Sequence, residues 1–459
     1  MHFTTELYYM TFLAKGSAKK PAIQAFFISL GVFFEWYDFT LYFYLGSILS
    51  SVFFNGSTGN NNLSLYYAIF AIAYICRPIG GIIFGRLADR YGRRHALLLA
   101  MKCMFIASLG MALLPTYAHL GITASILMLL FRALQGISIG GEYTGVLTLV
   151  FEGSKAHHEG KYLSMIGVIS CLGQMASACF LFLMMHFTSH AFMIHIGWRI
   201  CFLVGAAGMA VVYYFQSTVP ESQSFLDTKK QGKLTKKPIL YTLQHHRLSL
   251  TLVFLLTGTL GIAYILYFVS IPNELINRAP LDETKIHSAI IVATVIQTLC
   301  YPIGGWLSDK ISPTRILLVL FTLTLLTVFP CNNYLMHHFL SDGFIIYLGL
   351  IAIFSIATPA FSLLINQCFP VHCRASGVFV GYNIANALFC SITPSVGIIF
   401  SDGTFSMNIL SGFLITSLAL CVLVLLISQT VTNKQTRKQD SQLKKSLLEG
   451  LDNAKPINI

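Results

Sequence analysis

The chain has 459 residues, of which 55% are hydrophobic and only 10% are charged, and its mean hydropathy is +0.70. A soluble domain carries about 25% charged residues, so this composition excludes an ordinary soluble protein and indicates a membrane protein. The net charge of +12 lies in short basic runs between long apolar segments. That distribution argues against nucleic-acid binding and is typical of residues that set orientation in a membrane.

Twelve apolar segments are long enough to cross a bilayer, which takes about 20 residues of helix. In chain order they are predicted at residues 23–52, 64–86, 96–116, 121–150, 162–187, 198–217, 249–272, 285–307, 315–336, 343–367, 376–400 and 405–428. Twelve crossings place both termini on one side. With that side inside, and with residues at the span ends counted with the adjoining side, 24 of the 30 Lys and Arg are cytoplasmic, three are external and three lie within spans, so we expect cytoplasmic termini.

The spans divide the chain into two halves, which predicts an all-α membrane fold of two pseudo-symmetric six-helix bundles. The expected parts are a cytoplasmic N-terminus (1–22), a first bundle (23–217), a basic cytoplasmic linker (218–248), a second bundle (249–428) and a cytoplasmic tail (429–459). Within the linker, "PILYTLQHHRL" is predicted to form a short amphipathic helix. The eleven cysteines show no CxxC pair and the His pairs lack partners at ligand spacing, so no metal and no cofactor are expected.

A repeat links the two halves. The loop after the second span reads "GRLADRYGRR" and the loop after the eighth reads "GWLSDKISPTR", each preceded by "PIGG" and offset by 220 residues. A duplicated motif at half-chain spacing is typical of a duplicated transporter. We expect a conformational latch in which the acid sits at the N-terminal end of a neighbouring helix. Its predicted residues are Gly85, Asp89, Arg90, Gly92, Arg93 and Arg94 in the first copy and Gly305, Asp309 and Lys310 in the second.

These motifs carry a resemblance to the major facilitator superfamily, and more narrowly to the metabolite:proton symporters, which include proline/betaine, 2-oxoglutarate, citrate and shikimate permeases. The matching stretches are "FFEWYDF", "RPIGGIIFGRLADRYGRR", "RALQGISIGGEYTG", "GWRICF", "PESQSF", "PIGGWLSDK" and "FPVHCRASG". The resemblance implies secondary transport in a bacterial inner membrane. Ser312 stands where the first motif copy has Gly92, so the second latch is expected to be the weaker one. The short tail lacks the long coiled coil of osmosensing members, so the resemblance does not extend to osmotic regulation.

Six ionisable residues fall within the first four predicted spans: Glu35, Asp38, Arg77, Lys102, Arg132 and Glu142. Such groups are costly in hydrocarbon and mark functional sites, and three acids with three bases suggest mutual pairing. Gly31, Glu35, Asp38, Tyr42 and Gly46 form one helical stripe, which we expect to face a central cavity. The candidates for proton coupling are Glu35, Asp38, Arg77, Arg132 and Glu142, with a fixed ion-pair network as the alternative. Lys102 is expected to extend its ammonium to the membrane surface.

Uncharged polar side chains supply the candidates for substrate binding: Tyr42, Gln135, Tyr264, Tyr267, Gln297, Tyr382, Asn383 and Asn386. Hydrogen bonding between helices is the alternative role for each of them. The basic residues suit an organic acid, the acids and aromatic rings suit a quaternary ammonium compound, and a zwitterion such as proline or betaine would use both.

The predicted function is therefore proton-coupled symport of a small polar metabolite by alternating access, with substrate, protons and the lipid bilayer as partners and no nucleic acid. A monomer is expected to suffice. A facilitator or an antiporter of the same fold remains open. A membrane enzyme is disfavoured because no nucleophile–base set, metal-ligand spacing or phosphate loop accompanies the spans, and a channel is disfavoured by the duplicated latch.

Overall fold

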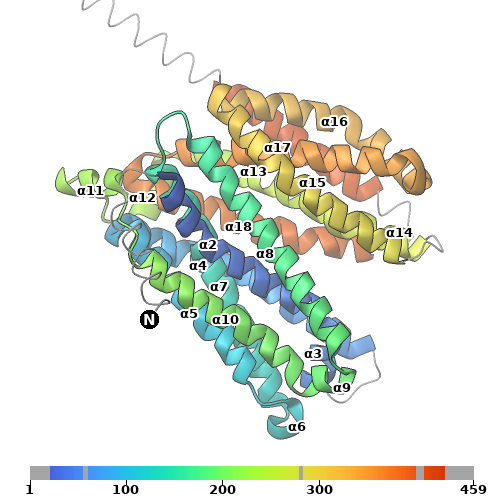
Figure 1. Cartoon of the computed structure of the whole chain (residues 1–459). Coiled ribbons are helices and arrows are strands. Elements are labelled where there is room, and N and C mark those ends of the chain that lie inside the picture. The colour runs from blue at the N-terminus through green and yellow to red at the C-terminus, as the bar shows by residue number, and fades with distance from the viewer. Residues whose placement is uncertain (1–20, 55–59, 279–282, 400–407, 430–459) are drawn as a thin grey trace, which may run out of the picture.

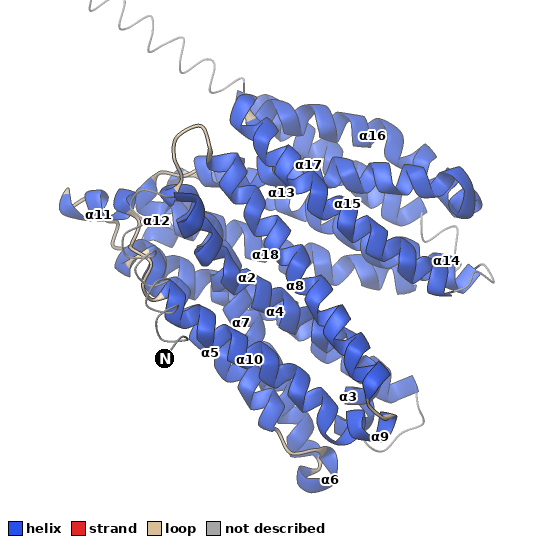
Figure 2. Cartoon of the chain, in the orientation of Figure 1, coloured by secondary structure: helices blue, strands red, loops and turns tan. Residues whose placement is uncertain are grey.

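The computed structural model describes residues 21–54, 60–278, 283–399 and 408–429, and within these residues the chain is helical without strands (Figure 2). Twelve of the described helices have 19 or more residues. They are α2 (Pro21–Tyr44), α4 (Asn60–Tyr91), α5 (Arg93–Leu113), α7 (Ile122–Gly153), α8 (Glu159–Phe187), α10 (Trp198–Gln216), α13 (Arg247–Ile265), α15 (Glu283–Lys310), α16 (Pro313–His338), α17 (Phe344–Gln367), α18 (Arg374–Ile399) and a last helix, Asn408–Gln429.

Short elements cap or extend these helices: α3 (Gly46–Phe53), α6 (Tyr117–Leu120), α9 (His190–Phe192), η2 (Met193–Gly197), α11 (Gln223–Lys230), α12 (Pro238–His245), η3 (Leu266–Ser270), α14 (Ile271–Arg278), η4 (Phe339–Gly343) and η5 (Val371–Cys373). Among the described residues, ten of the twelve long helices contain a stretch long and apolar enough to cross a membrane. The predicted all-α membrane class is confirmed. The predicted linker helix is present as α12, whereas α11 lies in a stretch for which no helix was expected.

The predicted span boundaries are too short at the second helix. The sequence indicated residues 64–86, but α4 continues through Pro78 and ends only at Tyr91. The repeated motif therefore lies on the last turns of a membrane helix rather than in a loop. Gly92 ends the helix with a φ of +123°, a value that strains any residue with a side chain.

The long helices form two halves, α2 to α10 and α13 to Asn408–Gln429, joined by α11 and α12 (Figure 1). Across the halves α4 packs against α18 and α8 against α15. We call the end that carries the α4–α5 and α15–α16 junctions the latch end. At the opposite end α3 packs on elements of the first half and α14 on elements of the second, so the close contacts between halves lie nearer the latch end.

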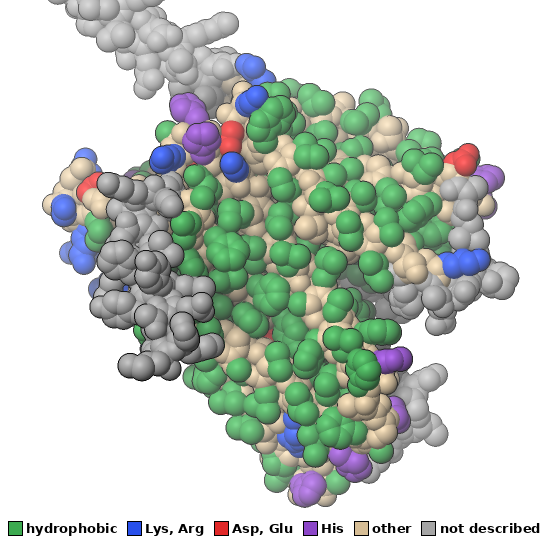
Figure 3. Space-filling model, in the orientation of Figure 1, with side chains coloured by type: hydrophobic (Ala, Val, Ile, Leu, Met, Phe, Trp, Pro, Cys, Tyr) green, Lys and Arg blue, Asp and Glu red, His purple; other side chains and the backbone are tan. Residues whose placement is uncertain are grey.

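On the face shown in Figure 3, apolar side chains cover the middle of the surface, and lysines and arginines gather mainly near the latch end. Residues such as Phe182 and Leu326 are 67% and 71% exposed on long helices, as expected of side chains that face lipid. Nearly all of the predicted N-terminal segment (1–22) and tail (429–459) lies outside the described residues.

Candidate functional site

A buried chain of hydrogen bonds joins an acid on α2 to a base on α7. Arg132 Nη1 donates to Gln135 Oε1 (2.6 Å), Gln135 Nε2 donates to Ser108 Oγ (3.3 Å), and Ser108 Oγ donates to Asp38 Oδ2. All four side chains are at most 2% exposed. Arg132 also acts on Asp38 through its charge. Sequence reasoning expected Arg132 to meet an acid of the first helix but missed Ser108, a small polar residue in an apolar span that gave no signal.

The helix packing leaves just enough room for this chain. A Cβ atom at Gly205 of α10 would collide with Asp38 Oδ1, so the glycine allows the carboxylate to lie between α2 and α10. The Arg132 guanidinium lies 3.9 Å from the ring centroid of Tyr42 and 5.3 Å from that of Phe39. Tyr42, predicted to bind substrate, thus lies against the base of the chain.

A second base lies in the first half. Arg77 on α4 is 4% exposed, and its guanidinium lies 4.5 Å from the Tyr74 ring and 5.4 Å from the Phe39 ring. Its charge acts on Glu35 and on Tyr382 of the second half, so Arg77 lies near the boundary between the halves. Lys102, in contrast, is exposed, with its ammonium 5.4 Å from the Tyr213 ring.

The expected orientation of the α2 stripe holds for only part of it. Asp38 turns into the first half, toward Ser108, whereas Glu35 lies near Arg77 and acts on Tyr382 of the second half. The predicted mutual pairing of acids and bases is wrong at Glu142. Its side chain is 0% exposed, it forms no ion pair within the described residues, and neither carboxylate oxygen accepts a hydrogen bond there. The Gln216 amide and the Met101 methyl group lie near it beside Gly31, and the charges of Asp38 and Glu35 act on it.

Aromatic and polar side chains from both halves meet at the boundary. The Trp36 and Tyr264 ring centroids are 6.5 Å apart, and Tyr264 donates to Gln174 Oε1 (3.4 Å). Tyr143 of α7 stacks on Tyr382 of α18 at 5.4 Å. Rings with polar edges on both sides of one boundary can contact a small polar solute from two directions.

The remaining substrate candidates occupy three different settings. Gln297 donates to Tyr301 (3.1 Å) at the α8–α15 boundary. Asn383 donates to Gly140 O of α7 and Asn386 to Tyr382 O, so both fix helix backbones. Tyr267 lies inside the second half, where its carbonyl accepts a bond from Tyr347, and is not brought together with the others.

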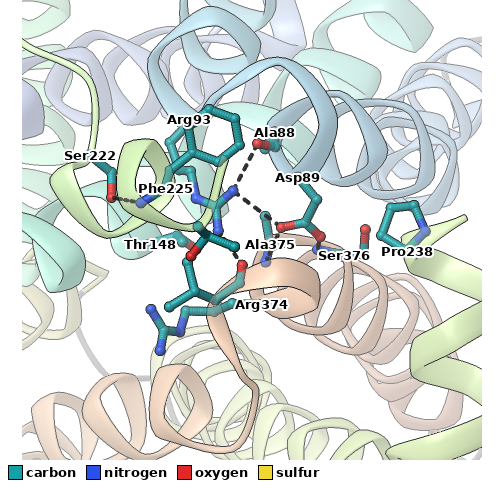
Figure 4. Close-up of polar contacts among 12 residues, drawn as sticks. Ala88, Asp89, Arg93, Thr148, Ser222, Phe225, Pro238, Arg374, Ala375 and Ser376 are labelled. Carbon is teal, nitrogen blue, oxygen red and sulfur yellow. Dashed lines mark hydrogen bonds and ion pairs between the residues drawn. The ribbon is translucent and has the colours of Figure 1, made fainter. Parts of the chain in front are cut away.

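At the latch end Asp89 lies at the N-terminus of α18. Its carboxylate accepts hydrogen bonds from the backbone N–H groups of Ala375 (3.2 Å) and Ser376 (2.8 Å), and it pairs with Arg93 at 3.3 Å (Figure 4). The helix dipole favours a negative charge at this point. The contact joins α4 of the first half to α18 of the second.

Glu152, Arg374 and Glu221, which were not predicted from the sequence, complete this latch. Glu152, at the end of α7, binds both Arg93 (3.1 Å) and Arg374 (2.8 Å) and so joins the halves a second time. Glu221 of the "PESQSF" stretch accepts from the backbone N–H of Arg93 (2.9 Å). A side chain at Gly92 would collide with the Glu221 carboxylate, so this position requires glycine for space as well as for its positive φ. The quoted motifs contain Glu221 and Arg374 but not Glu152, and they did not indicate the pairing.

The second copy of the motif makes the pseudo-symmetric contact. Asp309 accepts hydrogen bonds from the backbone N–H of Gly160 (2.7 Å) and Lys161 (3.1 Å) at the N-terminus of α8. Lys310 lies over the Trp306 ring at 4.1 Å, and Arg90 of the first copy is exposed over the Tyr91 ring. Among the described residues Asp309 has no ion pair, so its contact is simpler than that of Asp89.

The linker helix contacts the latch through aromatic rings. Tyr241 of α12 stacks on His245 at 4.3 Å and lies 5.1 Å from the His372 ring in η5. Burial lowers the pKa of His372, and burial together with the neighbouring histidines lowers that of His246. Both rings are therefore favoured in their neutral form.

These features define an all-helical membrane transporter: two packed halves, a buried acid–base chain within one, and acids of both halves bound to helix N-termini of the other. The family model described as "Sugar (and other) transporter" matches residues 24–247, and that of the "Major Facilitator Superfamily" matches residues 253–455. The chain belongs to the major facilitator superfamily. Its relatives include proteins named as an ectoine/proline transporter, an alpha-ketoglutarate permease and a citrate-proton symporter.

Among these relatives are the ectoine/proline transporter of Corynebacterium glutamicum (29% identical, covering 82% of this chain and 77% of the relative) and the alpha-ketoglutarate permease of Escherichia coli K12 (29%, 79% and 83%). The citrate-proton symporter of Salmonella typhi is 26% identical, covering 80% of this chain and 85% of that protein. Among solved structures, the proton:xylose symporter bound to 6-bromo-6-deoxy-D-glucose has a TM-score of 0.72 at 17% identity, covering 88% of this chain and 94% of that one.

Proposed function

We propose that this transporter couples the uptake of a small carboxylate-bearing metabolite to the entry of protons. The observation that carries the proposal is the buried chain from Arg132 through Gln135 and Ser108 to Asp38. A carboxylate held by a hydroxyl and a nearby guanidinium is stabilised as an anion. Protonation removes that charge, so the state of Asp38 can be linked to the conformation of the helices around it.

The latch supplies the other half of the mechanism. With Asp89 and Asp309 both bound to helix N-termini, the latch end is closed. Proton and substrate bind from the opposite end. They shift the equilibrium between the conformations with a closed and an open latch end only as far as they bind one conformation more tightly than the other. We assign the latch end to the cytoplasm because the basic residues gather there. Cytoplasmic termini, a bacterial inner membrane and function as a monomer are part of the proposal.

The boundary between the halves is the proposed substrate site. Arg77 is the anchor for a substrate carboxylate, since its buried guanidinium lies over the Tyr74 and Phe39 rings and forms no ion pair within 4 Å among the described residues, which leaves donors for one. Trp36, Tyr264 and the Tyr143–Tyr382 stack offer faces for an ammonium group. A zwitterion of the proline or betaine kind uses both features, whereas a di- or tricarboxylate uses Arg77 alone.

Transport in proteoliposomes tests the proposal. Vesicles with an acidic exterior should accumulate labelled substrate above its equilibrium level, and a protonophore should abolish the accumulation. A screen of amino acids, betaines and di- and tricarboxylates by thermal shift first identifies the substrate. Equilibration that ignores the gradient would indicate a facilitator, and acceleration by a proton gradient of the reverse direction would indicate an antiporter.

A further inference from the structure

Among the described residues, Glu142 on α7 has no basic partner, and it lies near Gln216, whose amide oxygen accepts no hydrogen bond. A Cβ atom at Gly31 of α2 would lie 2.6 Å from Glu142 Oε1 and 3.0 Å from Gln216 Nε2, so both side chains lie beside this glycine. Gln216 Nε2 donates to the backbone carbonyls of Ile28 (2.7 Å) and Phe27 (3.3 Å). The amide oxygen of Gln216 is buried and accepts no hydrogen bond within the described residues, as is true of both Glu142 oxygens.

The charges around Glu142 have the same sign as its own. From α2, Asp38 and Glu35 act on it, and Gln216 is the group that α10 contributes. Arg77 of α4 has its guanidinium over the Tyr74 and Phe39 rings, and Lys102 of α5 is exposed. An ionised carboxylate without a counterion costs so much in a buried site that the group takes up a proton instead.

Resting on the proposed symport, we infer that Glu142 carries a second transported proton and that Gln216 Oε1 accepts a hydrogen bond from the protonated acid. One proton satisfies an oxygen on each side chain. The step is a simple transfer: an O–H bond forms on Glu142 as one breaks on a hydronium ion admitted from the open end, and the reverse occurs toward water once the latch end opens. Gln216 is a positioning residue, because it acts on the proton only through Glu142.

Infrared spectroscopy of the purified full-length protein in lipid tests the protonation directly. The carbonyl stretch of a buried protonated carboxyl group should be present in the wild type and absent in Glu142→Gln, and it should survive in Glu35→Gln and in the control Glu159→Gln, which alters an acid at the start of α8. Loss of the band in Glu35→Gln with its retention in Glu142→Gln would overturn the inference.

Gln216→Leu tests the positioning role. Loss of the acceptor should shift the Glu142 band to the frequency of a carboxyl group without a hydrogen bond, and should move the pH of half-maximal uptake to lower values by about one unit. Gln216→Glu, which keeps an acceptor oxygen, should restore the hydrogen-bonded frequency at low pH. A band unchanged in Gln216→Leu would mean that Gln216 only binds the α2 backbone.

Transport assays then distinguish a proton that Glu142 carries across the membrane from one that stays bound to it. Glu142→Gln, which mimics the protonated acid, should retain exchange of substrate across the membrane but take up at least tenfold less against a gradient. The ratio of protons to substrate measured at the reversal potential should fall by one. Full gradient-driven uptake in Glu142→Gln would overturn the role of Glu142 as a proton carrier, even if the infrared band had been assigned to this residue. Failure of the wild type to accumulate substrate would sink the symport proposal, while the spectroscopic result would stand independently.

Discussion

At the scale of single residues, the acid of the hydrogen-bonded chain is expected to be required for coupling. In Asp38→Asn the side chain keeps its shape but loses the charge that Arg132 and Ser108 stabilise. We expect gradient-driven uptake to fall at least tenfold while substrate exchange between the two sides continues. Paired uptake and exchange assays on the same vesicles measure this. Normal accumulation by Asp38→Asn would remove Asp38 from the coupling mechanism.

Ser108 is expected to tune the pH dependence of uptake rather than to enable it. Ser108→Ala removes a hydrogen bond from the ionised form of Asp38, which is worth about 1.5–3 kcal/mol for a charged acceptor. The neutral form gains relative to the ionised form, so the pH of half-maximal uptake should rise by about one unit. Ser138→Ala is the control, since Ser138 of α7 is also a buried serine bonded to a neighbouring helix, α5, through Ala100 O (2.6 Å), but does not contact Asp38. Equal profiles for the two variants would contradict the assignment.

At the scale of elements, the two latch acids are expected to differ in strength. Asp89 is 0% exposed and also pairs with Arg93, whereas Asp309 is partly exposed and, among the described residues, is held by its two backbone bonds without an ion pair. Asp89→Ala should therefore shift the equilibrium toward an open latch end by about 2 kcal/mol, roughly thirtyfold, and Asp309→Ala should shift it less. Spin labels at Lys155 and Arg315, exposed on opposite halves at the latch end, report the opening as a longer distance. A larger change in Asp309→Ala would reverse this ranking.

The contact between α12 and η5 is expected to weaken in acid. Burial lowers the pKa of His246 and His372 in the folded protein. Below about pH 6.5 the unfolded chain therefore binds more protons than the native one, and the free energy of unfolding decreases as the pH is lowered. The Tm should therefore drop more between about pH 7.5 and pH 5.5 in the wild type than in His372→Phe. His337→Phe, at an exposed ring on α16, serves as the control. An identical drop of Tm in His372→Phe would show that His372 does not cause the loss of stability in acid.

Whole helices and the repeat were predictable because apolar runs of membrane length and a motif at half-chain spacing are properties of the sequence alone. The partners of the buried acids were not. Helical periodicity placed Glu35 and Asp38 on one face of α2, but the direction of that face depends on packing, and Gly205 and Gly31 open the first half to it. Gln216 and Glu221 come from distant segments, and their roles follow only from the fold.

At the scale of the whole molecule, the halves meet along two pseudo-symmetric lines. Gly85 of α4 lies against α18, where an added Cβ would be 3.1 Å from Phe379 Cβ and 3.2 Å from Ser376 Cα. At the α8–α15 line Gly160 and Gly305 face one another, and a Cβ on either would lie 2.6 Å from the carbonyl oxygen of the other. Both lines must separate if the latch end is to open.

The closed latch end is therefore expected to depend on the absence of side chains at these glycines. Gly85→Val should part α4 from α18, lengthen the distance between labels at Lys155 and Arg315, and lower gradient-driven uptake without unfolding the protein. Gly349→Val in α17, where nothing lies within 4 Å of an added Cβ, should change none of these measurements. Gly305→Val acts on the same equilibrium from the second half, so the double variant should open the latch end further than either single one. Unchanged label distances in Gly85→Val would show that the two halves do not move apart along this line.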